Sequence, residues 1–165
     1  MSLHSGSKTS LLDFQFYQFA GSLVKPHQLA AVHYYLGAIK RQRNNEKSEK
    51  MYSDQQKLIA NLQRQNVIIT FGHVIQHPDK SYHEKGVDVR LAVEMIRFAR
   101  KNQYDIAYLI SSDTDLVPAV QEVQSFGKKV HYVGISQGQS FGLTKAADDV
   151  HLLRTEDISK LFIQN

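Results

Sequence analysis

The chain has 165 residues, of which 42% are hydrophobic and 22% charged, and its formal net charge is +4. This length and composition are typical of one globular domain and exclude a disordered or low-complexity chain. Cysteine is absent, which excludes disulfide scaffolds, thiolate zinc sites, iron–sulfur clusters and cysteine nucleophiles. Any metal ion must therefore be bound by oxygen or imidazole.

The sequence carries no signal for membrane insertion or secretion. No apolar run approaches the ~18–20 residues that span a bilayer. The first ten residues, MSLHSGSKTS, lack the apolar segment of a secretory signal. We therefore expect a cytoplasmic protein without a membrane partner.

Helices and strands are predicted to alternate along the chain. The first half is expected to contain a helix over 11–24, a strand over 30–39, a long polar helix over 44–66, a strand over 67–74 and a polar loop over 76–85. The second half is expected to contain a helix over 87–101, a strand over 106–110, a helix over 116–126, a strand over 129–133, a Gly-rich loop, a short helix over 143–147, an apolar patch over 150–153 and a helix from 155. This order predicts one α/β domain over 1–165, with a mainly parallel sheet between two layers of helices.

The predicted helix over 87–101 has the broadest apolar surface. One stripe is widened by a second, so we expect the helix to lie on the sheet. The first stripe consists of Val87, Leu91, Met95 and Phe98, and the second of Val89, Ala92, Val93 and Ile96.

Positive charge is concentrated in the first part of the sequence. Residues 1–64 contain nine Lys and Arg against four Asp and Glu, which leaves 11 basic and 12 acidic residues downstream. A basic segment suits a phosphate-bearing partner, although an ordinary solvated helix face would look the same. The candidate contact residues are Lys40, Arg41, Arg43, Lys47 and Lys50.

Two aspartates follow the predicted strand over 106–110, in the segment IAYLISSDTDLVP. Ligands of open α/β sheets bind beyond the C-terminal ends of the strands. Asp113 and Asp115 would lie there on a tight turn, where both carboxylates could hold a hard divalent cation. The alternative is that Asp115 only caps the next helix, which leaves Asp113 without a role.

Two further acidic residues lie in the segment EKGVDVRLAVEM. Asp88 is in the first turn of a helix and shares a face with Leu91 and Ala92, so we expect its carboxylate to point inward along the sheet. A favourable interaction with the helix dipole is the alternative. Glu94 lies on a different face, where it could join a metal site or pair with an arginine of the same helix, Arg90 or Arg97.

Three segments resemble one known family. EKGVDVRLAVEMI, YDIAYLISSDTDLVPAVQEVQSFGKKVHYVGI and LTKAADDVHLL are similar to the NYN domain, in the LabA-like branch of the PIN-like nuclease superfamily. The similarity is strongest over 28–153. It implies a PIN-like parallel sheet, an acidic cluster that binds Mg²⁺ or Mn²⁺, and hydrolysis of RNA.

The resemblance assigns roles to particular residues. Asp88 matches the aspartate of a KGxD motif and Lys85 its lysine, while Asp113 and Asp115 match the aspartates of an SGDSD motif. Thr114 matches the hydroxyl residue between these aspartates. Ser112 departs from the family, which usually has glycine at that position. The implied metal ligands and catalytic residues are Asp88, Asp113 and Asp115, with Thr114, Ser112, Lys85 and Glu94 in supporting positions.

The family pattern also opens with a strand, IDGxN-like, just before the segment SLHSGSK of this chain. That strand is central in the family and carries a metal-binding aspartate, so we expect the central N-terminal strand to be missing or replaced here, by truncation or by loss of catalysis. A gap at this position leaves dimerisation or strand exchange open.

Two functional hypotheses follow. The first is a divalent-metal-dependent ribonuclease in which the basic segment over 40–64 binds RNA, and the second is a catalytically inactive RNA-binding or regulatory module. A phosphatase with an aspartate nucleophile fits poorly, because only about fifty residues follow Asp115. Among the eight histidines, His73 and His77 have a ligand-like interval, and we interpret them as surface or edge residues.

Overall fold

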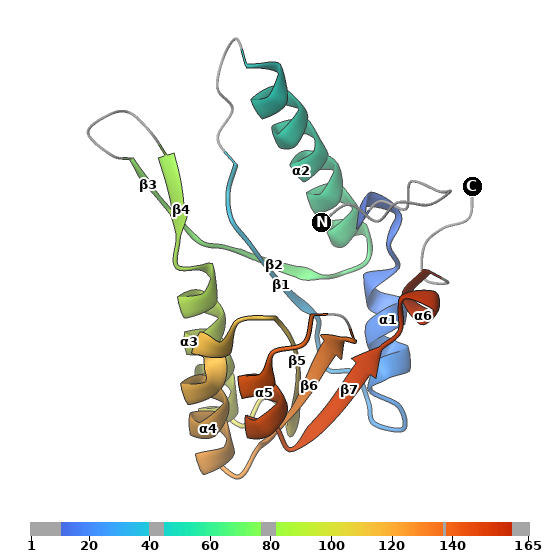
Figure 1. Ribbon diagram of the computed structural model, residues 1–165, viewed down its shortest axis with the longest axis vertical. Helices are drawn as coiled ribbons and strands as arrows, with labels where there is room; N and C mark the ends of the chain where they lie inside the picture. The colour runs from blue at the N-terminus through green and yellow to red at the C-terminus, as the bar shows by residue number, and fades with distance from the viewer. Residues whose placement is uncertain (1–10, 40–44, 77–81, 137, 160–165) are drawn as a thin grey trace.

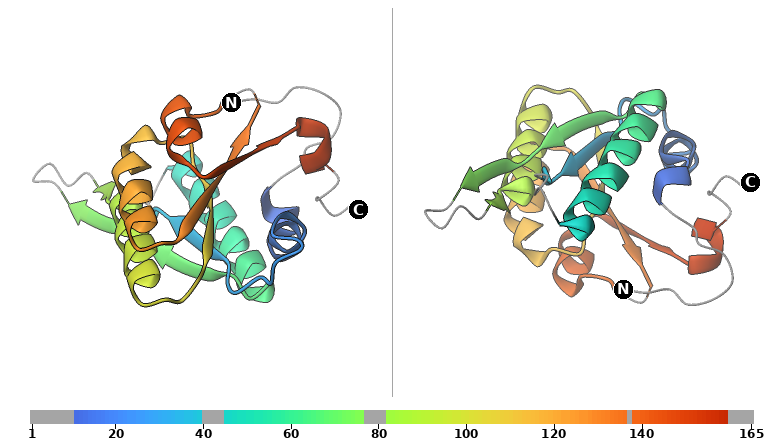
Figure 2. Two further views of the ribbon diagram at one scale, coloured as in Figure 1. Left: turned by 90° about the horizontal axis from the view of Figure 1, so that it is seen from below. Right: turned by 90° about the horizontal axis from the view of Figure 1, so that it is seen from above.

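Two parallel sheets form the framework of the fold in the computed structural model, and helices pack against them (Figure 1). The structure describes residues 11–39, 45–76, 82–136 and 138–159, and of residues 73–76, 82–85, 155 and 159 it describes the backbone only. In Figure 2, α3 (Val87–Arg100) and α4 (Val117–Ser125) lie on one side of the strands, and α1 (Phe16–Leu23) and α2 (Glu46–Arg64) lie on the other. The predicted three-layer α/β/α architecture is therefore confirmed.

The first sheet consists of β1 (His33–Leu36) and β2 (Ile68–Phe71), which pair in parallel with His33 opposite Ile68. The connection between them is α2, which begins after Asn45, whose side chain accepts a hydrogen bond from the Ser48 N–H. The helix holds the chain beyond β1 through Gln55, which is 7% exposed. Its amide nitrogen donates to the Gly37 carbonyl over 2.6 Å, and its amide oxygen accepts from the Ile39 N–H over 2.9 Å.

The N-terminal part of the described chain contains η1 (Leu11–Asp13) and α1. The sequence predicts one helix over 11–24, whereas the structure interrupts it between Asp13 and Phe16. Phe14 is 7% exposed. Its carbonyl accepts hydrogen bonds from the side chains of Asn61 on α2 and of Gln65, the residue after that helix, over 3.2 and 2.9 Å. These hydrogen bonds hold the segment between η1 and α1 against the C-terminal end of α2.

An antiparallel hairpin follows β2 and corrects the sequence prediction. The structure divides the strand predicted over 67–74 into β2 and β3 (His73–Gln76), and it places β4 (Tyr82–Lys85) in the predicted loop over 76–85. In the hairpin, His73 lies opposite Lys85. Polar residues dominate β4, so the hydrophobic pattern had no signal there, and only backbone pairing with β3 reveals the strand.

The second parallel sheet has the order β5 (Ile106–Ile110), β6 (Lys129–Ile135) and β7 (Asp149–Leu153). Its strands are connected by η2 (Thr114–Leu116) with α4, and by α5 (Phe141–Ala146), and α6 (Thr155–Ser159) follows β7. One face of this sheet packs against α3, α4 and α5. The buried core consists of Met95, Ala99, Leu109, Leu116, Ala119, Val120, Val123, Val130, Tyr132 and Leu143.

Helix α3 contacts both parallel sheets. Met95 and Ala99 belong to the core under β5 and β6. The ring of Phe98 lies 5.2 Å from that of His33 on β1. The expectation that both apolar stripes of this helix lie on the sheet is wrong in part, because Val89 and Val93 are 66% and 54% exposed. Ala92 and Ile96 of the second stripe do pack against the core, together with Leu91 and Met95.

No hydrogen-bonded ladder joins β1 to β5 within the described residues. The two parallel sheets are instead linked through α3. The first ten residues, where the sequence departs from the family pattern, lie outside the described residues, so the missing central strand stays a prediction. No helix in the described part of the chain combines the length and the apolar character that crossing a bilayer requires.

Candidate active site

The turn after β5 carries two of the three predicted metal ligands. Asp113 precedes η2, and its Oδ1 accepts a hydrogen bond from the Asp115 N–H over 2.9 Å. The Asp113 N–H donates in turn to Ser111 Oγ over 3.1 Å. The sequence left open that Asp115 only caps the next helix. This alternative is wrong, because Asp113 caps η2, and Asp115 is an exposed residue within η2.

A chain of hydroxyl groups connects this turn to the second sheet. Thr114 Oγ1 lies 3.0 Å from Ser140 Oγ. Ser140 is 5% exposed and caps α5, with its Oγ accepting from the Leu143 N–H over 3.3 Å. The Ser140 N–H donates to the hydroxyl of Tyr132, a buried residue of β6, over 2.9 Å. The turn that carries Asp113 and Asp115 is thus held by the side chain of Ser140, which precedes α5, and through it by Tyr132 of β6.

Gly142 completes this contact. A Cβ atom at Gly142 would collide with Cγ2 of Thr114, so only glycine allows α5 to approach the turn this closely. Sequence reasoning missed Tyr132, Ser140 and Gly142 as neighbours of the carboxylate turn. The Gly-rich segment that ends at Gly142 is the available signal, but the sequence predicts only a loop there.

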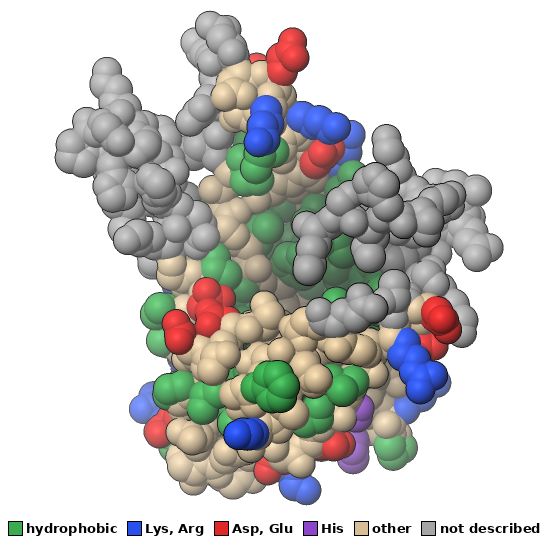
Figure 3. Space-filling view, viewed as in Figure 1, with side chains coloured by type: hydrophobic (Ala, Val, Ile, Leu, Met, Phe, Trp, Pro, Cys, Tyr) green, Lys and Arg blue, Asp and Glu red, His purple; other side chains and the backbone are tan. Residues whose placement is uncertain are grey.

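Asp88, the third predicted ligand, lies in the first turn of α3, which begins after Gly86 with a φ of 85°. The expectation that its carboxylate points inward is wrong, because Asp88 is exposed. Asp88 lies in the first turn of the helix, whereas the residues that pack in the core, Leu91 and Met95, come later in the helix. In Figure 1, α3 and α4 both begin in the middle part of the molecule, below the β3–β4 hairpin, and Figure 3 shows acidic side chains in this area.

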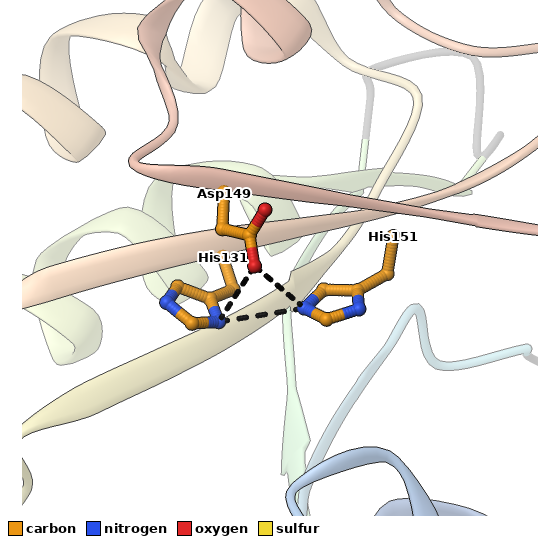
Figure 4. A group of neighbouring side chains, drawn as sticks. All are labelled: His131, Asp149 and His151. Atoms are coloured by element: carbon orange, nitrogen blue, oxygen red, sulfur yellow. Dashed lines mark hydrogen bonds and ion pairs between the residues drawn. The ribbon is translucent and has the colours of Figure 1, made fainter.

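Ligand atoms of the three predicted carboxylates do not form one group. Among the described residues, one set of three or more potential metal ligands converges, and it consists of His131, Asp149 and His151 (Figure 4). Asp88, Asp113 and Asp115 are all described, and their ligand atoms do not converge in this way. Exposed carboxylates repel one another, and a bound cation would remove that repulsion.

Glu94 is a buried carboxylate whose two oxygens are both hydrogen-bonded to protein groups. It is 5% exposed. Its Oε1 accepts from Arg90 and Arg97 over 2.9 and 3.4 Å, and its Oε2 accepts from the hydroxyls of Tyr35 and Thr70 over 3.0 and 3.4 Å. Burial alone would raise the pKa of Glu94, but hydrogen bonds from Arg90 and Tyr35 and the two positive charges lower it below the usual value. Of the two roles that the sequence left open for Glu94, the structure shows pairing with the arginines of its own helix.

The remaining predicted residues are placed as follows. Ser112 is exposed beside the carboxylate turn, and Lys85 is the last residue of β4, with its side chain outside the described atoms. Lys47 and Lys50 are exposed on α2. Lys40, Arg41 and Arg43 lie outside the described residues. The predicted basic surface can thus be located only on α2.

Comparison with known proteins identifies the fold and the family. The NYN domain matches residues 4–154. A crystal structure of a Vibrio parahaemolyticus protein of unknown function is similar, with a TM-score of 0.63 and 22% sequence identity, covering 87% of this chain and 80% of that one. None of the curated proteins matches the sequence significantly.

The NYN domain belongs to a PIN-like superfamily that is known for nuclease activity. Its members act on RNA and typically depend on divalent metal ions. Since the match extends over nearly the whole sequence, this chain belongs to the NYN domain family.

Proposed function

We propose that this chain is a ribonuclease of the LabA-like branch, which hydrolyses RNA phosphodiesters with Mg²⁺ or Mn²⁺. The observation that carries the proposal is the position of Asp113 and Asp115. In a chain of the NYN family, both lie on the turn that follows the C-terminal end of β5, after two serines. Ligands of parallel α/β sheets bind at this end of the strands.

The donor set suits a hard cation. Asp113, Asp115 and Asp88 offer carboxylate oxygens, the ligands that Mg²⁺ and Mn²⁺ prefer over imidazole or thiolate. Asp113 uses Oδ1 to accept the Asp115 N–H. A carboxylate has about four lone-pair sites, so this hydrogen bond leaves the group able to bind a cation.

The bound ion would supply positive charge to stabilise the developing charge on the phosphodiester and would lower the pKa of a water molecule. Asp113 and Asp115 would hold it, and Asp88 would bind it from the first turn of α3. One carboxylate would also accept the proton of the water that attacks phosphorus, while the bond to the leaving oxygen breaks. The hydroxyl chain from Thr114 to Tyr132 would keep the turn fixed during this step.

RNA would be bound by the basic residues of the first half, with its phosphates near Lys47 and Lys50. The described part of this segment, helix α2, has a smaller net positive charge than the whole segment. Helix α2 carries three carboxylates beside four basic residues, and Lys57 lies 3.9 Å from Asp54. Positive and negative charges on α2 therefore nearly cancel. Lys40, Arg41 and Arg43 would have to supply much of the electrostatic attraction to the RNA phosphates.

A second candidate function is an inactive RNA-binding or regulatory module, either as a monomer or as a homodimer. Two observations favour it: the three carboxylates do not converge, and β1 and β5 are not paired. In this alternative the metal-binding aspartate of the predicted central strand is absent, and RNA is retained without being cut.

Cleavage of a labelled single-stranded RNA separates the two functions. The ribonuclease proposal expects product with Mn²⁺ or Mg²⁺ and none with a chelator. Binding measured on the same RNA gives the second readout. Metal-independent binding without any cleavage would contradict the ribonuclease proposal and support the inactive module.

A further inference from the structure

We propose that His131, Asp149 and His151 form a second metal site, which binds a transition metal ion such as Zn²⁺. The three side chains come from neighbouring strands. In the parallel register of β6 and β7, His131 lies opposite Asp149, and Val133 lies opposite His151. This pairing brings both ends of the sequence Asp149-Val150-His151 to the His131 side of the sheet.

The site lies on the sheet face opposite α3, α4 and α5. Val130 and Tyr132 of β6 belong to the core beneath those helices, and Val150 of β7 packs against it. Successive side chains of a strand point to opposite faces, so His131, Asp149 and His151 point away from this core. The site is therefore separate from the carboxylate turn, which is beyond the C-terminal end of β5.

The interatomic distances match those between the ligands of one ion. His131 Nδ1 and His151 Nε2 lie 3.4 Å apart. Asp149 Oδ2 lies 3.4 Å from His151 Nε2 and 3.9 Å from His131 Nδ1. A tetrahedral Zn²⁺ with bonds of about 2.0–2.1 Å separates its ligand atoms by roughly 3.3 Å. The backbone therefore already holds the three groups at a binding distance.

The same distances fit direct hydrogen bonds less well. N–H···O and related bonds in proteins have a typical length of about 2.9–3.0 Å. All three separations exceed this length while the three atoms still face one another (Figure 4). An ion at the centre would satisfy all three groups at once.

The chemistry of the site favours a transition metal over Mg²⁺. Two imidazoles and one carboxylate form a set that is typical of Zn²⁺, with a fourth position open. The side chain of His131 is 13% exposed and its Nδ1 faces Asp149 and His151, so this nitrogen is directed into the group. The side chain of Asp149 is 57% exposed, which gives an ion access from solvent.

Tyr108 of β5 supports the two rings. Its ring lies 5.0 Å from that of His131 in an edge contact and 5.8 Å from that of His151. Tyr108 therefore lies against both imidazoles on this face of the sheet. Because β7 is at an edge of this sheet within the described residues, an ion bound here would also link β7 to β6.

The test is Zn²⁺ titration of the full chain, prepared without a histidine tag and stripped with a chelator, in saturating Mg²⁺. Calorimetry should find one Zn²⁺ per chain. Asp149→Asn and His151→Gln should weaken binding by more than the ~10–100-fold that loss of an outer-shell partner costs. Asp149→Asn is the safer variant, because its Oδ1 can still accept the Val150 N–H.

The matched control is His27→Gln at an exposed position before β1, which should bind Zn²⁺ as the wild type does. Asp113→Asn should also retain Zn²⁺ binding, which separates this site from the proposed nuclease site. The proposal is overturned if the wild type binds no Zn²⁺, or if Asp149→Asn and His151→Gln bind it with unchanged affinity.

Discussion

Thr114 Oγ1 lies 3.0 Å from Ser140 Oγ, and this contact joins the carboxylate turn after β5 to the first residue before α5. It gives a surface turn a fixed position, since Ser140 is itself held by the hydroxyl of Tyr132. The turn that carries Asp113 and Asp115 is therefore part of the packed structure of the second sheet.

Gly142→Ala should destabilise the protein. The new methyl group would collide with Thr114 Cγ2, and rotating Thr114 away would break its contact with Ser140. Overpacking of this kind costs about 1–3 kcal/mol, which exceeds the ~0.5–1 kcal/mol that alanine gains over glycine in a helix. Urea denaturation measures the difference.

The control is Gly21→Ala in α1, where no atom lies within 4 Å of the added Cβ, so this variant should be slightly stabilised. Thr114→Ser in the Gly142→Ala background should restore part of the stability, because it removes Cγ2 and keeps the hydroxyl. A Gly142→Ala variant as stable as Gly21→Ala would show that the close approach is absent.

Glu94→Gln should lower stability at pH 7 by about 1.5–3 kcal/mol, the usual contribution of hydrogen bonds to a charged group. The pKa of Glu94 is lowered in the folded protein from its ordinary value of 4.5, so its contribution is present above that pH and is lost as the pH falls through the folded pKa. Below about pH 4.5, the stability of the wild type should therefore fall more steeply than that of Glu94→Gln.

Denaturation between pH 3 and 7 tests this prediction, with exposed Glu122→Gln on α4 as the control. The control should follow the wild type. If the free energies of unfolding of Glu94→Gln and the wild type changed in parallel across this pH range, Glu94 would not be a charged group stabilised by its hydrogen bonds.

Replacing Lys47 and Lys50 together by glutamine should weaken RNA binding and reduce its dependence on salt. Two lost phosphate contacts on single-stranded RNA would make the slope of log affinity against log salt shallower by about 1.4. Filter binding at several salt concentrations measures the slope. Lys101→Gln, at the exposed C-terminal end of α3, is the control. An unchanged slope in the double variant would exclude Lys47 and Lys50 from the RNA contact.

The sequence predicted those parts of the fold that depend on local pattern. The strand over 106–110 was found with its observed bounds, because its five apolar and aromatic residues stand between Asp105 and Ser111. The position of Asp113 and Asp115 followed from that strand. Polar β4 could not be found in this way, because its residues have no apolar pattern.

Features that depend on contacts between distant segments were also missed. The closeness of Thr114 to Ser140 follows from the packing of α5, and the convergence of His131 with His151 follows from the register of β6 and β7. The sequence Asp149-Val150-His151 shows that two possible ligands share a strand face. It does not show that His131 is their neighbour.

The most direct test of the nuclease account is RNA cleavage by Asp113→Asn in Mn²⁺. Asparagine can still accept the Asp115 N–H and cap η2, so this variant removes the charge while the turn keeps its hydrogen bond. Glu122→Gln is the matched control. We expect metal-dependent cleavage by the wild type and by Glu122→Gln, and none by a folded Asp113→Asn. Wild-type activity in Asp113→Asn would contradict this expectation.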